Sequence, residues 1–191
     1  MMHPFALETG EGGKRKFLAA THADFWARYC TIPRRSKHFY EVIRERQACR
    51  LFFDIEFKFK FNPTSDGDQM MEVFVEFLTQ RLRHNFQIDM KREHIVDMSG
   101  TTRDKFSRHL VCHLFAPACV CRSTPSDHTC SCSEQELFFA DTSHAGNFVK
   151  RCLHDMEKEV IANPSSPLVC PAVCIVATLG LLVCGGRHPT Y

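Results

Sequence analysis

The sequence lacks a strong net charge, an internal repeat and a recognisable secretion signal. Its 24 lysines and arginines nearly balance 22 aspartates and glutamates, which leaves a formal net charge of +2. Bulk charge therefore favours no particular class of partner. The first residues, MMHPFALETGEGG, contain no charged region followed by an apolar core, so we expect no signal peptide.

The basic residues are distributed less evenly than the net charge suggests. Ten lysines and arginines fall between residues 14 and 50, against few acids. A basic face in this region is suited to a polyanion, and an ordinary solvated surface is the alternative interpretation.

Cysteine is abundant, with 11 residues in a chain of 191. Because secretion is not expected, reduced thiols or a metal site fit this count better than a disulfide framework. Two C-x-C pairs in a Cys/Ser-rich insertion over 117–136 are candidate zinc ligands, and a loop without metal is the alternative. We favour the loop because C-x-x-C pairs are more typical of zinc sites. The four candidate ligands are Cys119, Cys121, Cys130 and Cys132.

Strand-like and helix-like patterns alternate along the first 160 residues. Enrichment in β-branched and aromatic residues predicts strands at 14–20, 38–43, 49–59, 93–98 and 105–115. Apolar residues at helical spacing predict helices over 21–30, 69–86 and 146–162. This alternation indicates a layered α/β or α+β domain, and we expect the α+β class.

The composition changes to an apolar tail over 163–191. Residues 168–184 form an uncharged run of 17 residues, at the lower edge of the ~17–25 that span a bilayer. The run contains Pro171 and Gly180. A non-native tail from altered splicing or read-through is the interpretation that we favour over a membrane helix, so we do not expect a membrane partner.

Two carboxylates, Asp54 and Glu56, interrupt the apolar run CRLFFDIEFKF. Alternate side chains of a strand share a face, so both carboxylates point away from the side of Phe53 and Ile55. Their Cα atoms are expected to lie roughly 6.5–7 Å apart, which lets both reach one or two divalent cations. The solvent-facing acidic side of an ordinary strand is the alternative.

A second polar face is expected on the strand predicted at 105–115. Lys105, Ser107 and His109 alternate along it, and a cation, a hydroxyl and an imidazole in a row offer charge and donors to a triphosphate. A plain polar strand face is again the alternative. The two patterns together, about fifty residues apart, are less expected by chance than either one alone.

The motifs FFDIEF and DKFSRHLV resemble the D-x-E and S-x-H motifs of the archaeo-eukaryotic primase superfamily, and most closely those of the eukaryotic primase-polymerase (PrimPol) family. The resemblance continues in order through PFALE, ADFWARY, FYEVI and HAGNFVKRCL, and covers residues 4–153 apart from the insertion. It implies an α+β primase-like catalytic core of mixed sheets packed with helices. This core would occupy residues 1–160 and be incomplete at its C-terminus.

The resemblance also implies an activity. Members of the family are DNA-directed primases and polymerases that make primers and extend DNA in replication restart, damage tolerance and translesion synthesis. The implied partners are single-stranded template DNA, a primer, nucleoside triphosphates and a single-strand DNA-binding protein, in the nucleus and the mitochondrion. The chemistry is two-metal phosphoryl transfer, in which positioning and electrostatic stabilisation dominate.

The family's site residues carry over onto the matching motifs of this sequence. Asp54 and Glu56 correspond to two of the three catalytic carboxylates that bind Mn²⁺ or Mg²⁺. The implied nucleotide-binding residues are Arg15, Lys105, Ser107 and His109.

The sequence departs from the family pattern at the third carboxylate, for which we identify no equivalent aspartate. The later basic nucleotide-binding residues and the zinc-binding module used in priming are also missing. The chain therefore resembles a partial or alternatively spliced form. The alternative to an active enzyme is a catalytically incomplete fragment of the same fold that binds DNA or nucleotide.

Overall fold

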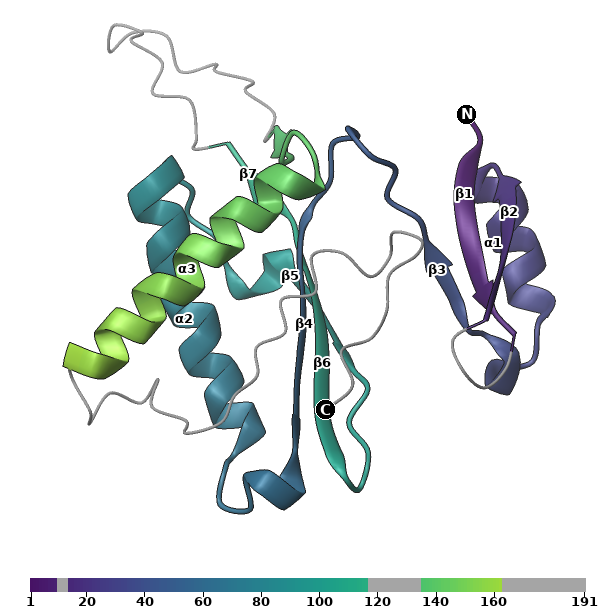
Figure 1. Cartoon of the computed structure of the whole chain (residues 1–191). Helices are drawn as coiled ribbons and strands as arrows, with labels where there is room; N and C mark the ends of the chain where they lie inside the picture. Colours follow the sequence, from purple (N-terminus) through teal and green to yellow (C-terminus); the bar gives the residue numbers. More distant parts are fainter. Residues whose placement is uncertain (10–13, 117–134, 163–191) are drawn as a thin grey trace, which may run out of the picture. The chain divides into compact units, whose positions relative to one another are not determined.

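The computed structural model describes residues 1–9, 14–116 and 135–162 (Figure 1). These residues form two compact units, one over residues 1–47 and one from residue 48 onward. Three small sheets and three α-helices within them confirm the α+β class. The sheets were expected to be mixed, but every strand pair within the described ranges is antiparallel.

The first unit is a three-stranded sheet with one helix. Its strands lie in the order β2-β1-β3 and comprise β1 (His3–Glu8), β2 (Arg15–Ala20) and β3 (Phe39–Glu41). Helix α1 (His22–Thr31) begins where Thr21 Oγ1 accepts a hydrogen bond from the Asp24 amide at 3.1 Å. The Phe5 ring of β1 stacks on Phe25 of α1 at 3.9 Å, which holds the helix on the sheet.

The second unit has a sheet of order β4-β6-β5 and two long helices. Its main elements are β4 (Leu51–Lys58), α2 (Gly67–Phe86), β5 (Ile95–Ser99), β6 (Lys105–Cys112) and α3 (Thr142–Ala162). A short hairpin of β7 (Leu114–Phe115) and β8 (Glu136–Leu137) completes it. Figure 1 shows α2 and α3 on one side of the β4-β6-β5 sheet.

The core of the second unit lies between this sheet and the helices. Phe53 of β4 meets Phe74 of α2 edge to face at 5.1 Å, and Phe86 of α2 meets Phe148 of α3 at 5.3 Å. The helix predicted over 69–86 is confirmed, and Phe74, Leu78 and Leu82 on its apolar side are buried, whereas Met70 is half-buried. The sheet face that α2 does not cover is the face of the predicted carboxylates.

One predicted strand is divided in the structure. The pattern over 105–115 predicted a single strand, but β6 ends at Cys112 and β7 begins at Leu114. Between them, the amide of His113 donates a hydrogen bond to the carbonyl of His94 at 2.8 Å. This contact continues the β5–β6 pairing by one residue pair, and β7 then pairs with β8 instead. The strand is therefore divided by a change of partner strand, which no pattern in the local sequence predicts.

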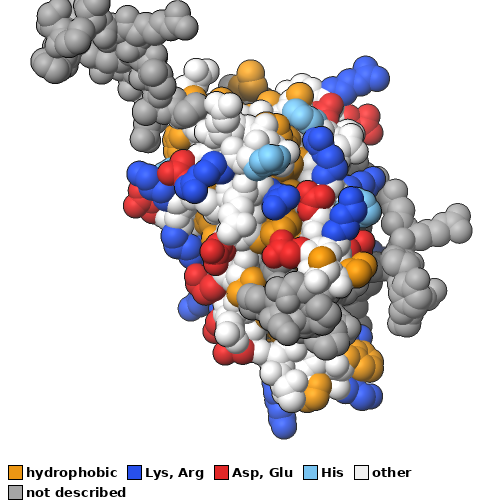
Figure 2. Space-filling model, turned by 90° about the vertical axis from the view of Figure 1, so that its left-hand side faces the viewer, with side chains coloured by type: hydrophobic (Ala, Val, Ile, Leu, Met, Phe, Trp, Pro, Cys, Tyr) orange, Lys and Arg blue, Asp and Glu red, His pale blue; other side chains and the backbone are white. Residues whose placement is uncertain are grey.

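The outer face of α2 and α3 carries acidic and basic side chains side by side rather than a field of one sign (Figure 2). Within the described ranges, no helix is long and apolar enough to cross a membrane. The apolar tail over 163–191 and the insertion up to residue 134 lie outside the described residues. The predicted domain boundaries therefore stay predictions.

Gly67, the first residue of α2, provides a test of this packing. A Cβ atom at this position would overlap the Phe106 ring, which is 4% exposed and stacks on Phe57 at 5.0 Å. We expect Gly67→Ala to lower the free energy of unfolding by about 1–3 kcal/mol, although alanine is the better helix former. Chemical denaturation measures the change. The exposed control Glu72→Ala should stay within about 0.5 kcal/mol of wild type, and equal stability of both variants would contradict the packing.

Candidate functional site

The register of β4 against β6 brings the predicted site residues onto one sheet face. Asp54 lies directly opposite His109, and Glu56 lies directly opposite Ser107. The burial of β4 alternates strictly, so that its apolar residues face α2 and its carboxylates face away. The shared face expected from the sequence is confirmed.

Each carboxylate of this face has a basic neighbour. Lys105 Nζ lies 2.5 Å from Glu56 Oε2, and His109 Nε2 lies 3.3 Å from Asp54 Oδ1. The side chains of Asp54 and Glu56 are both 38% exposed, so a ligand from solvent can reach them. The face thus combines two hard oxygen ligands with two groups that can contact an anion.

Asp54 is the least satisfied member of the group. Within the described residues, its buried Oδ1 has no hydrogen-bond partner, and His109 is a close charge neighbour without a hydrogen bond. Burial raises the pKa of Asp54, His109 opposes the increase, and the nearby Glu56 adds to it. The ionised form of Asp54 is therefore under-stabilised, and a bound cation would relieve this.

Ser107 is placed differently from its neighbours, because only 2% of it is exposed. Its amide donates to Thr101 Oγ1 at 3.1 Å, and the amide of Gly100 donates to its carbonyl at 2.9 Å. A Cβ built on Gly100 would lie 3.1 Å from Ser107 Oγ. The turn between β5 and β6 therefore covers the hydroxyl, and contact with a phosphate requires this turn to shift.

The remaining carboxylate of this sheet, Asp97 of β5, faces the helices instead. It lies opposite the buried Leu110 of β6. Its Oδ2 accepts from Arg92 Nη2 at 2.9 Å, and its Oδ1 lies 3.6 Å from Arg108 Nη1. Asp97 is therefore part of an ion-pair network on the helix side, and the strands β4, β5 and β6 supply two carboxylates to the candidate site.

Arg15, the remaining predicted nucleotide-binding residue, belongs to the first unit. It begins β2 opposite Glu8, and its guanidinium lies over the Tyr40 ring at 5.5 Å. Its role at a nucleotide stays a prediction.

The four predicted zinc ligands, Cys119, Cys121, Cys130 and Cys132, lie outside the described residues. The described thiols are free, and three of them are buried. Burial raises the pKa of Cys112 to about 12 and that of Cys152 to about 11, so neither is a thiolate at neutral pH. These two cysteines act as small apolar core residues.

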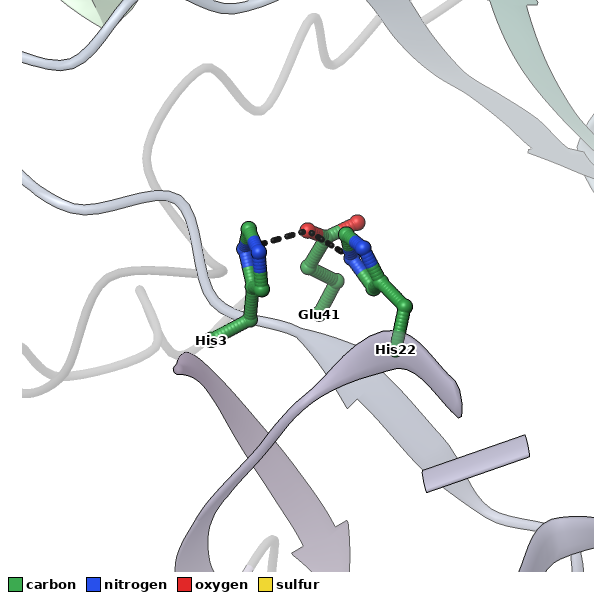
Figure 3. A group of neighbouring side chains, drawn as sticks. All are labelled: His3, His22 and Glu41. Carbon is green, nitrogen blue, oxygen red and sulfur yellow. Dashed lines mark hydrogen bonds and ion pairs between the residues drawn. The ribbon is translucent and has the colours of Figure 1, made fainter. Parts of the chain in front are cut away.

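A second polar cluster, which the sequence did not predict, joins His3, His22 and Glu41 in the first unit (Figure 3). The three residues come from β1, α1 and β3 and have no motif spacing. Only the pairing of the strands brings them together.

Comparison with known proteins identifies relatives of the chain, although no family model matches it. It is 32% identical over 169 residues to a DNA-directed primase/polymerase protein of Gallus gallus, covering 87% of this chain and 26% of the relative. The proteins of the same name from Homo sapiens and Mus musculus are 32% and 33% identical over 153 residues, or 80% of this chain.

The chain spans about a quarter of the length of the curated relatives that it matches. The match covers most of this chain and recurs in each relative at similar identity. The chain is therefore a homologue of the DNA-directed primase/polymerase proteins.

Proposed function

We propose that the chain carries a metal- and nucleotide-binding part of a template-directed DNA primase/polymerase. The observation that carries this proposal is the β4–β6 register, which sets Asp54 and Glu56 beside His109 and Lys105. Similarity to proteins named DNA-directed primase/polymerase supports the same conclusion.

The residues fit a hard divalent cation. Asp54 offers a buried oxygen without a hydrogen bond, and Glu56 adds a second carboxylate from the same face. Mg²⁺ and Mn²⁺ both suit oxygen ligands of this kind. When bound, such an ion neutralises charge on the triphosphate and stabilises the oxygens of phosphoryl transfer. Asp54 and Glu56 are the residues that would hold such a cation, and both project from the same strand.

The basic side chains of the face bind the triphosphate. Lys105 is held over the face by Glu56, and His109, with half its side chain exposed, offers a donor nearby. A nucleotide that displaces Lys105 from Glu56 frees that carboxylate for the cation. Ser107 joins them once the turn at Gly100 and Thr101 moves aside.

Template DNA is the proposed partner of the basic first unit. Seven of its lysines and arginines are exposed, at positions 14, 16, 28, 34, 35, 44 and 46. Phosphate contacts of this kind are independent of base sequence and weaken steeply with salt. Arg50, which lies in the second unit, is not assigned this role because its guanidinium already donates two hydrogen bonds to Glu136, at 2.8 and 3.1 Å.

A binding fragment without turnover is the second candidate function, favoured by the orientation of Asp97 away from the site. A single-strand DNA-binding partner and a nuclear and mitochondrial location are further proposals that rest on the family alone.

Template-dependent nucleotide incorporation tests the enzymatic proposal. We expect the purified chain to extend a labelled primer in Mn²⁺, and Asp54→Asn to reduce extension to background because it removes a metal ligand. Glu72→Gln, an exposed carboxylate on α2, is the matched control and should keep full activity. Wild-type extension no greater than that of Asp54→Asn would contradict turnover and leave the binding fragment.

Metal binding has a thermodynamic signature that does not need turnover. Mn²⁺ at tenfold its dissociation constant should add about 1.4 kcal/mol of stability, which raises the Tm of a chain of this size by about 3–6 °C. Asp54→Asn should lose this shift and, in EDTA, melt about 1–2 °C above wild type because it removes an under-stabilised charge. Differential scanning calorimetry measures both. A Mn²⁺ shift that survives in Asp54→Asn would argue against this ligand.

The raised pKa of Asp54 gives both metal affinity and stability a pH dependence. Protons compete with Mn²⁺ for this carboxylate, so the affinity should weaken as the pH falls through its raised pKa. In EDTA the folding stability depends on pH in the opposite direction. Protonated Asp54 stabilises the fold, and this contribution is lost as the pH rises through the raised pKa. Calorimetric Mn²⁺ titrations between pH 4.5 and 7.5 measure the first effect. A wild-type affinity that stays constant over this pH range would refute it.

A further inference from the structure

We propose that His3, His22 and Glu41 form a binding site for a divalent transition metal of the Zn²⁺ type. One ligand atom from each side chain lies within 4.8 Å of the other two. His22 Nε2 lies 3.4 Å from Glu41 Oε1, and His3 Nδ1 lies 4.0 Å from the same oxygen. Figure 3 shows the carboxylate reaching toward both rings.

The backbone beneath this cluster is held by regular structure. His3 lies opposite Ala20 in the β1–β2 ladder, and Glu41 lies opposite Phe5 in the β1–β3 ladder. His22 follows directly after Thr21, whose side chain caps α1. Each ligand therefore projects from a fixed backbone position, as a metal site requires.

The spacing of the ligand atoms is close to that of a zinc site. Zinc bonds of about 2.0–2.1 Å in tetrahedral geometry place neighbouring ligand atoms about 3.3 Å apart. The 3.4 Å contact already satisfies this, and the 4.0 Å contact needs a shift of well under about 1 Å. The His3 and His22 rings stack at 3.9 Å with an interplanar angle of 21°, so they must turn for both lone pairs to converge. The side chain of His22 is 62% exposed, which leaves it room to turn.

The ligand types select the class of metal. Two imidazoles and one carboxylate suit Zn²⁺ and its neighbours, whereas Mg²⁺ prefers oxygen ligands alone. Three protein ligands also leave a fourth position open. His22 and Glu41 line an aromatic cleft of about 490 Å³ with Phe25 and Trp26, so water in this cleft can occupy that position.

Zinc binding to the full-length chain tests the proposal independently of polymerase activity. The protein is stripped with EDTA, titrated calorimetrically with ZnCl₂ under reducing conditions, and its bound zinc is counted by atomic absorption. His22→Ala and Glu41→Gln remove one ligand each from exposed positions, and circular dichroism checks that both variants fold. His84→Ala, an exposed histidine on α2, is the matched control.

We expect wild type and His84→Ala to bind one more equivalent of zinc than His22→Ala and Glu41→Gln. Any zinc bound by thiolates elsewhere in the chain is the same in all four proteins, so it cancels in this difference. Imidazole nitrogen resonances of His3 and His22 should shift on zinc addition. Equal stoichiometry and affinity in all four proteins, or resonances that respond to pH but not to zinc, would overturn the site and leave an ion-pair cluster.

Discussion

The antiparallel pairing of β4 with β6 is the constraint on which both the core and the candidate site depend. Leu51, Phe53, Ile55 and Phe57 are each at most 4% exposed, so the hydrophobic effect fixes which face of β4 meets α2. A slip of one residue would turn this whole set to the solvent face. The same register sets the carboxylates of β4 against the basic side chains of β6. The stability of the core therefore determines the geometry of the site.

The site itself is not optimised for stability. Lys105 compensates Glu56 closely, but Asp54 keeps a buried oxygen without a hydrogen bond and a raised pKa. An aspartate in this condition disfavours its own ionised form and weakens the metal-free fold. Native chains depart from local stability chiefly where a ligand supplies the missing interaction. The oxygen of Asp54 that lacks a hydrogen bond therefore supports the proposed cation site.

The sequence predicted what depends on local periodicity. The alternation of β4 identified its buried and exposed faces, and apolar residues at helical spacing identified the helix over 69–86. The burial of Ser107 was not predictable, because it depends on a turn that folds back through Thr101. The cluster of His3, His22 and Glu41 was missed for a related reason. The ends of β1, β3 and α1 converge there because the strands pair and α1 packs on their sheet. The spacing of these residues along the chain does not indicate this contact.

The orientation of Asp97 limits how a cation can be held. Turning Asp97 toward the site would require β5 to slip by one residue, which would move the buried Ile95 to the opposite face and break two arginine contacts. The sheet therefore offers two carboxylates, fewer than a hard cation needs, and water or substrate oxygens must complete its shell. Under the proposed function, triphosphate oxygens would serve this purpose while Lys105 and His109 contact the same phosphates. Metal and nucleotide would then bind cooperatively, since each would complete the binding site of the other.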